Sequence, residues 1–139
     1  MKKRFPALCV KDLERALERI APAELAEEWD NVGLLIGDPA AKVERALVAL
    51  EITRPVLREA ARRRVQAIVT HHPLIFRPLS RVVASDVTGR LALEVVRIGA
   101  AALAAHTNLD HAPEGTNLAL AELAGLRESE ILRPLALED

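Results

Sequence analysis

Two adjacent histidines directly follow a short apolar run in the segment "QAIVTHHPLIFRPL", residues 66–79. The run, which contains Ile68 and Val69, is typical of a buried strand that ends at His71. Beyond a strand end the chain turns, and Pro73 favours an extended conformation for the residue before it, so both imidazoles can face one side. Two interpretations fit this segment alone: a metal site, or two solvated histidines in a loop.

Helices and strands alternate on both sides of this segment. Apolar residues at helical spacing, or an alanine-rich composition, predict helices over residues 10–22, 54–64, 90–99 (with a start before Arg90) and 117–126, and a short helix within 22–31. Short apolar runs predict strands over residues 32–39, 45–53, 65–70 and 101–107, with a further short strand in 129–139. Residues 45–53 are apolar on both faces, as in a central strand, and residues 108–116 are expected to form a loop.

This alternation predicts an α/β fold with a layered, mostly parallel sheet flanked by helices. At 139 residues the chain has the size of one domain, residues 1–139, and half of it is apolar. Aromatic residues make up only 2%, so alanine, leucine, valine and isoleucine must fill the core.

The charge and the cysteine content limit the classes of partner and the cellular setting that we expect. With 19 basic and 20 acidic residues the net charge is −1, which argues against bulk electrostatic binding of nucleic acid. The basic run at residues 62–64 closes a predicted helix, where solvated cations favour the helix dipole. A lone cysteine, Cys9, excludes an internal disulfide and predicts a reducing, cytoplasmic setting. No apolar run is long enough for a membrane span, so no membrane partner is expected.

All four histidines lie between residues 71 and 111. The predicted strands 65–70 and 101–107 end near His71 and His106, and open α/β sheets bind ligands at the carboxyl ends of their strands. If the two strands are neighbours, about 4.8 Å apart, His71, His72, His106 and Asp110 could converge in one crevice. Asp110 could bind a metal or orient a histidine. Such a set suits Zn, Fe, Mn or Ni without choosing between them.

Other polar and aromatic residues have simpler interpretations. His111 is expected to be an ordinary loop histidine. Asp30 and Asn31 suit a turn as well as they suit a site. Trp29, the single tryptophan, is expected in the core or in an interface. The glycines form no phosphate-binding motif, and Cys9 is too far from the histidines in sequence to suggest a nucleophile.

Three motifs together resemble one family. They are "LAEEWDNVGLLIGDP" (residues 25–39), "VTHHPLIF" (69–76) and "AHTNLDHAPEGTNLALAELAGL" (105–126). In this order they are similar to the YbgI-like family, also called the Nif-three-like or GTP cyclohydrolase I type 2 homologue family. The resemblance spans residues 25–126, most of the chain, and implies a Nif-three-like α/β fold with a dinuclear metal centre.

The resemblance also implies roles for single residues. His71 and His72 would each bind one of two metal ions, and Asp110 would bind the same ion as His72. His106 would be a weak ligand or a group that contacts one, and Asn31 would line the same cleft. The family forms ring-shaped hexamers, and some members are assigned GTP cyclohydrolase activity. The implied function is that of a metal-dependent hydrolase acting on a nucleotide or a phosphorylated small molecule. The alternative is a non-catalytic metal-binding or regulatory scaffold that forms a ring.

The chain departs from the family pattern at its C-terminal end. Family members are longer, and their C-terminal part supplies a further histidine and a bridging glutamate. No histidine follows His111 here. The chain is therefore expected to be a fragment, a truncated member, or one product of a split gene whose partner chain supplies the remaining ligands. Alone, it is expected to bind metal with incomplete occupancy.

Overall fold

A four-stranded sheet forms the centre of the molecule. A computed structural model describes residues 7–128 and 130. The strands are β2 (Gly33–Ile36), β4 (Ala46–Ala49), β5 (Ala67–Thr70) and β6 (Ala101–Ala104), in the order β2-β6-β5-β4. β4, β5 and β6 are parallel, whereas β2 is antiparallel to β6. The predicted α/β fold with a mostly parallel sheet is confirmed.

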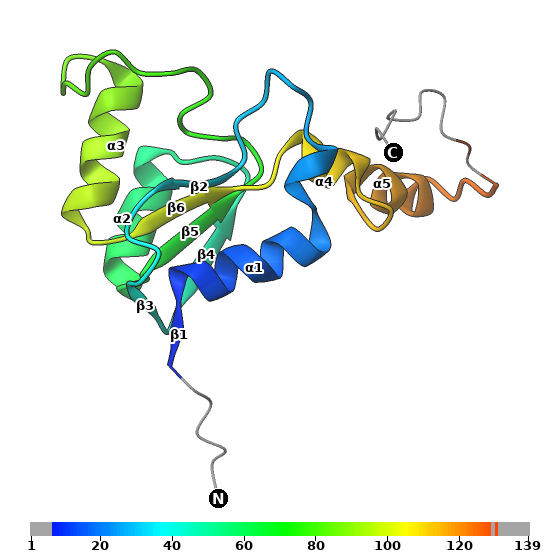
Figure 1. Ribbon diagram of the computed structural model, residues 1–139, viewed down its shortest axis with the longest axis horizontal. Helices are drawn as coiled ribbons and strands as arrows, with labels where there is room; N and C mark the ends of the chain where they lie inside the picture. Colours follow the sequence, from blue (N-terminus) through cyan, green and yellow to red (C-terminus); the bar gives the residue numbers. More distant parts are fainter. Residues whose placement is uncertain (1–6, 129, 131–139) are drawn as a thin grey trace, which may run out of the picture.

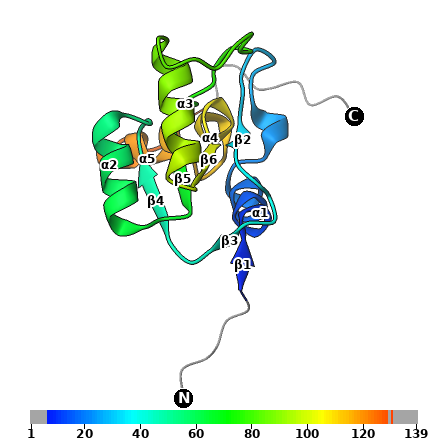
Figure 2. The ribbon, with the colours of Figure 1, turned by 90° about the vertical axis from the view of Figure 1, so that its left-hand side faces the viewer.

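Helices cover both faces of this sheet (Figures 1 and 2). α1 (Val10–Ile20) packs on one face, and α2 (Arg54–Arg63) and α3 (Val87–Arg97) pack on the other. The helices α4 (Thr107–His111) and α5 (Thr116–Leu123) and the 3-10 turn η1 (Ala23–Leu25) lie beyond the end of the sheet, where α4 contacts both α5 and η1 (Figure 1). A small antiparallel pair joins β1 (Leu8–Cys9) to β3 (Lys42–Val43). The helices predicted over 10–22, 54–64, 90–99 and 117–126 are all present, and the one within 22–31 is the short turn η1.

The two faces of the sheet bury separate apolar clusters. On one face, Ile68 of β5 packs with Leu57 of α2 and Val95 of α3. On the other, Leu103 of β6 packs with Val10 of α1. Aliphatic side chains and alanines make up both clusters, and the described residues place no aromatic side chain in them. This matches the core expected from composition.

Two predicted elements are wrong. Residues 45–53 do not form a central strand, because β4 lies at the edge of the sheet and Val48 is 77% exposed. The side chains of α1 reach β2, β6 and β5 on that face and leave β4 uncovered. Residues 108–116 are not all loop, because α4 begins directly after β6. Amides of Leu109 and Asp110 donate to the carbonyl of His106, and the side chain of Asn108 accepts from the amide of His106. The strand predicted in residues 129–139 lies outside the described residues.

The basic run at residues 62–64 is the solvated end of α2, as predicted. Arg62 and Arg63 both donate to the carboxylate of Glu59, and these bonds hold the pKa of Glu59 down to about 2. Arg64 then ends the helix in the left-handed conformation, with φ 52°. In the described part of the chain, no helix combines the length and the apolar character needed to cross a membrane.

Candidate metal centre

The sheet brings the histidines together, since β5 and β6 are adjacent parallel strands and both end at the same edge. Thr70, the last residue of β5, is in register with Ala104, the last residue of β6. The ends of the two strands therefore lie side by side, with His71 and His72 after one and His106 after the other. The amide of His72 donates to the carbonyl of Leu50 at 2.8 Å, which fixes the turn against the end of β4. The expectation that the two strands are neighbours is confirmed.

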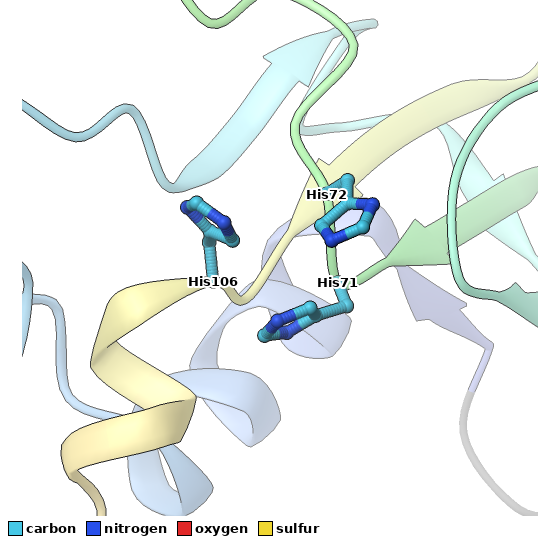
Figure 3. Close-up of side chains that lie close together, drawn as sticks. All are labelled: His71, His72 and His106. Atoms are coloured by element: carbon cyan, nitrogen blue, oxygen red, sulfur yellow. The ribbon is translucent and has the colours of Figure 1, made fainter. Parts of the chain in front are cut away.

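The rings of His71, His72 and His106 form one cluster (Figure 3). Each offers one ring nitrogen, and these three atoms all lie within 4.8 Å of one another. The ring centroids are 5.0 Å apart for His71 and His106 and 5.1 Å apart for His71 and His72. No other group of three or more potential ligands occurs among residues 7–128 and 130.

Oxygen atoms next to the rings leave nitrogens free for a metal. Nδ1 of His71 lies 3.0 Å from the carbonyl oxygen of Ala105, which can only accept a hydrogen bond. Nδ1 of His106 lies 2.9 Å from a carboxylate oxygen of Asp30. Nδ1 therefore donates in both rings, which directs Nε2 of each neutral ring to a metal ion. This arrangement, with the outer nitrogen donating to a carbonyl or carboxylate, is typical of metal-binding histidines. The residues present fit a divalent metal ion.

Asp30, for which the sequence left a turn and a site equally open, contacts the histidine cluster. Its side chain is fully buried, next to the ring of His106. One carboxylate oxygen accepts from the ring of His106, and the other accepts from the amide of Thr107 at 3.0 Å and from its hydroxyl. Asp30 thus holds both the ring of His106 and the first turn of α4. In the sequence it suited a turn as well as a site, and the family resemblance implied a role for Asn31 but none for Asp30.

The pKa of Asp30 reflects these contacts. Burial acts to raise it, but hydrogen bonds from the hydroxyl of Thr107, the ring of His106 and the amides of Thr107 and Asn31 together lower it below its ordinary value. The ionised carboxylate therefore stabilises the folded chain.

A pH dependence follows from the lowered pKa of Asp30. The stabilisation is fully present above the ordinary aspartate pKa of about 3.9 and is lost as pH falls through the lower pKa of the folded chain. In metal-free protein, the difference in unfolding free energy between the parent and Asp30→Asn should shrink as the pH falls below about 5. Urea unfolding at stepwise pH measures this difference. The same difference for Asp38→Asn, at an exposed turn, serves as the control. If the difference for Asp30→Asn does not change with pH, the ionised carboxylate of Asp30 does not stabilise the fold as assigned.

Asp110 lies in α4 rather than in the expected loop, yet it reaches the site. Its Oδ1 is 3.7 Å from Nε2 of His71, and the same oxygen accepts a hydrogen bond from the hydroxyl of Thr116. Asp110 therefore contacts the ring of His71, and its assignment to the same ion as His72 stays a prediction. Asn31 donates to the carbonyl of Ile75 at 2.5 Å, which ties the loop before β2 to the loop after the histidine pair.

Neither His111 nor Trp29 is one of the three clustered rings. His111 is not a loop histidine as predicted, because it is the last residue of α4. Nδ1 of His111 is 2.8 Å from the carbonyl oxygen of Leu25, so this ring ties α4 to η1. Trp29 is not in the core of the described residues, because 60% of it is exposed. The alternative of an interface for Trp29 stays a prediction.

A family model described as Duf34/NIF3 (NGG1p interacting factor 3) matches residues 8–137. The chain belongs to this family. This confirms the family that the three motifs indicated, and it covers all the described elements of the sheet and the site.

Curated relatives agree with this assignment. A Clostridium acetobutylicum protein named GTP cyclohydrolase 1 type 2 homolog is 36% identical over 126 residues, 91% of this chain and 47% of that protein. A protein of the same name from Halalkalibacterium halodurans is 39% identical over 121 residues, 87% of this chain and 32% of that protein. The chain thus spans a third to a half of the length of these Duf34/NIF3 relatives.

Solved structures share the fold. The Bacillus cereus protein related to NIF3 has a TM-score of 0.87 at 36% identity, over 93% of this chain and 36% of that one. Reduced HcgD from Methanocaldococcus jannaschii has a TM-score of 0.83 at 30% identity, over 94% of this chain and 52% of that one. The chain therefore has the same fold as the part of each of these proteins that it matches.

Proposed function

We propose that this chain is a divalent-metal-binding protein whose site is built on His71, His72 and His106, and that the site serves a metal-dependent hydrolase. One observation carries the proposal. Three imidazole nitrogens from the ends of two adjacent strands lie within 4.8 Å of one another, and neighbouring oxygens orient two of the rings. The donor set, imidazole with a nearby carboxylate, suits Zn, Fe, Mn or Ni.

The residues have separate roles in this proposal. His71 and His72 each hold one of two ions, and Asp110 adds a carboxylate beside His71. His106 binds weakly or orients what the other two bind. Bound divalent ions would supply Lewis-acid activation of water and of a phosphate oxygen. The substrate is a nucleotide or a phosphorylated small molecule, and the names of the relatives favour a purine nucleotide. The same proposal includes a ring-shaped homo-oligomer, which sedimentation can test.

Zinc binding is the direct test. The parent chain, loaded with zinc and dialysed, should retain metal by elemental analysis and release it to a chelator. His71→Ala and His72→Ala should each weaken zinc binding by more than about 100-fold, because loss of a residue that merely orients a ligand costs about 10–100-fold. Titration calorimetry measures the affinities.

His111→Ala is the matched control, since this histidine bonds to η1 and lies outside the cluster. It should bind zinc as the parent does. Equal zinc affinity in all three variants contradicts the site. Turnover is assayed separately, with zinc, manganese or iron, on GTP and on simple phosphoesters. Metal binding without any turnover would contradict the hydrolase and favour the metal-binding or regulatory scaffold.

A further inference from the structure

Two aromatic side chains stand at the edge of the histidine cluster. The chain has one tryptophan, two phenylalanines and no tyrosine. Trp29 and Phe76 are the two of these within the described residues, and neither is in the core. Their ring centroids are 5.9 Å apart, and the centroid of Phe76 is 6.1 Å from that of His106. Phe76 therefore contacts the histidine cluster directly, and Trp29 is linked to it through Phe76.

These side chains are also exposed, so they contribute little buried apolar surface to the stability of the fold. Trp29 is 60% exposed and Phe76 is 39% exposed. Large aromatic side chains otherwise contribute strongly to a core when buried. The positions are fixed from both sides: Asp30, next to Trp29, is bonded to α4, and Asn31 bonds the carbonyl of Ile75, next to Phe76. The backbone next to each of the two exposed rings is therefore held in place.

The geometry of the pair leaves ring faces available. The planes of Trp29 and Phe76 meet at 69°, so the edge of one ring meets the face of the other. Such a contact occupies at most one face of one of the two rings. Phe76 makes a second contact of this kind with His106, at 88°, so Trp29, which is 60% exposed, has more surface open to a ligand. An exposed aromatic face stacks on any planar π system, with little dependence on which base it is.

We propose that Trp29 and Phe76 bind the planar heteroaromatic ring of a phosphorylated ligand whose phosphate lies at the three histidines. The placement of the phosphate rests on the proposed metal site, whereas the ring site rests on the aromatic pair. Phe76 lies between the other two groups, in ring contact with both Trp29 and His106, so one small ligand can reach from the stacking surface to the metal centre.

The test compares two phosphates that differ in the ring. GMP carries a base, whereas ribose 5-phosphate does not. Zinc-loaded parent protein should bind GMP more tightly by titration calorimetry, and GMP should quench the fluorescence of the single tryptophan. Trp29→Leu keeps an apolar side chain but removes the ring, and should weaken GMP binding about 5- to 150-fold, the usual range for a lost base–aromatic stack. Its affinities for ribose 5-phosphate and for zinc should not change.

Two further variants sharpen the result. Trp29→Phe keeps an aromatic face and should retain most of the GMP affinity, whereas Leu123→Ala, at an exposed site on α5, should match the parent. If the parent protein binds zinc but binds GMP no more tightly than ribose 5-phosphate, the ring site is contradicted and the metal site is not. Parent protein without zinc affinity overturns the metal site, and a ring-dependent preference for GMP that Trp29→Leu abolishes would still support the ring site. A Trp29→Leu variant with unchanged GMP affinity and an altered sedimenting mass overturns the proposal in favour of an interface.

Discussion

Replacing Asp30 with alanine should weaken zinc binding about 10–100-fold, the usual cost of removing a group that orients a metal ligand. The carboxylate holds Nδ1 of His106 at 2.9 Å, and without it the ring can rotate or change its protonated nitrogen. The same change should destabilise the metal-free chain. The amide of Thr107 would lose its acceptor inside the protein, and a buried donor left unpaired costs about 1–3 kcal/mol.

Two measurements separate the effects of Asp30→Ala. Titration calorimetry gives the zinc affinity, and urea unfolding of the metal-free chain gives the stability. Asp38→Ala is the matched control, since Asp38 also accepts a backbone hydrogen bond in a turn but is exposed. Asp30→Asn keeps one oxygen and the size of the side chain, so it should fall between the parent and Asp30→Ala. If Asp30→Ala matched Asp38→Ala in both measurements, Asp30 would have no part in orienting His106.

Asp30 also shows where prediction from sequence stops. Helices and strands followed from periodicity because each depends on residues a few positions apart. The convergence of His71 and His106 followed from one topological rule about the ends of parallel strands. The contact between Asp30 and His106 joins residues that are 76 positions apart. No local pattern records this contact, so the sequence around Asp30 could not decide between a turn and a site.

The two wrong elements have a similar origin. Residues 45–53 have the composition of a central strand, but β4 is exposed because α1 lies over its neighbours. The start of α4 depends on hydrogen bonds from Thr107 to Asp30, which is 77 positions away in sequence, and on the side chain of Asn108, which accepts from the amide of His106. In both cases tertiary contacts outweigh local preference. The histidine cluster was easier to predict because two of its three members are adjacent in sequence.

The strand that carries His106 depends on one large side chain. β6 reads Ala-Ala-Leu-Ala, and Leu103 is fully buried between Leu34 of β2 and Val69 of β5. It packs under α1, against Val10. Its neighbours in the strand are alanines, so no adjacent side chain can fill the space that its loss would leave. The packing of Leu103 therefore helps to hold β6, and with it His106, in position.

Leu103→Ala should lower the free energy of unfolding by about 2–5 kcal/mol, the sum of lost burial and of the cavity left behind. That is a large share of the roughly 5–15 kcal/mol that stabilises a typical domain. The same substitution at Leu123, which is 86% exposed on α5, should change it by no more than about 0.5 kcal/mol. Urea unfolding of metal-free protein compares the two variants, so metal affinity does not enter the result. Equal losses in both would mean that Leu103 is not the main support of β6, and that the histidines are held by the backbone bonds between β5 and β6 alone.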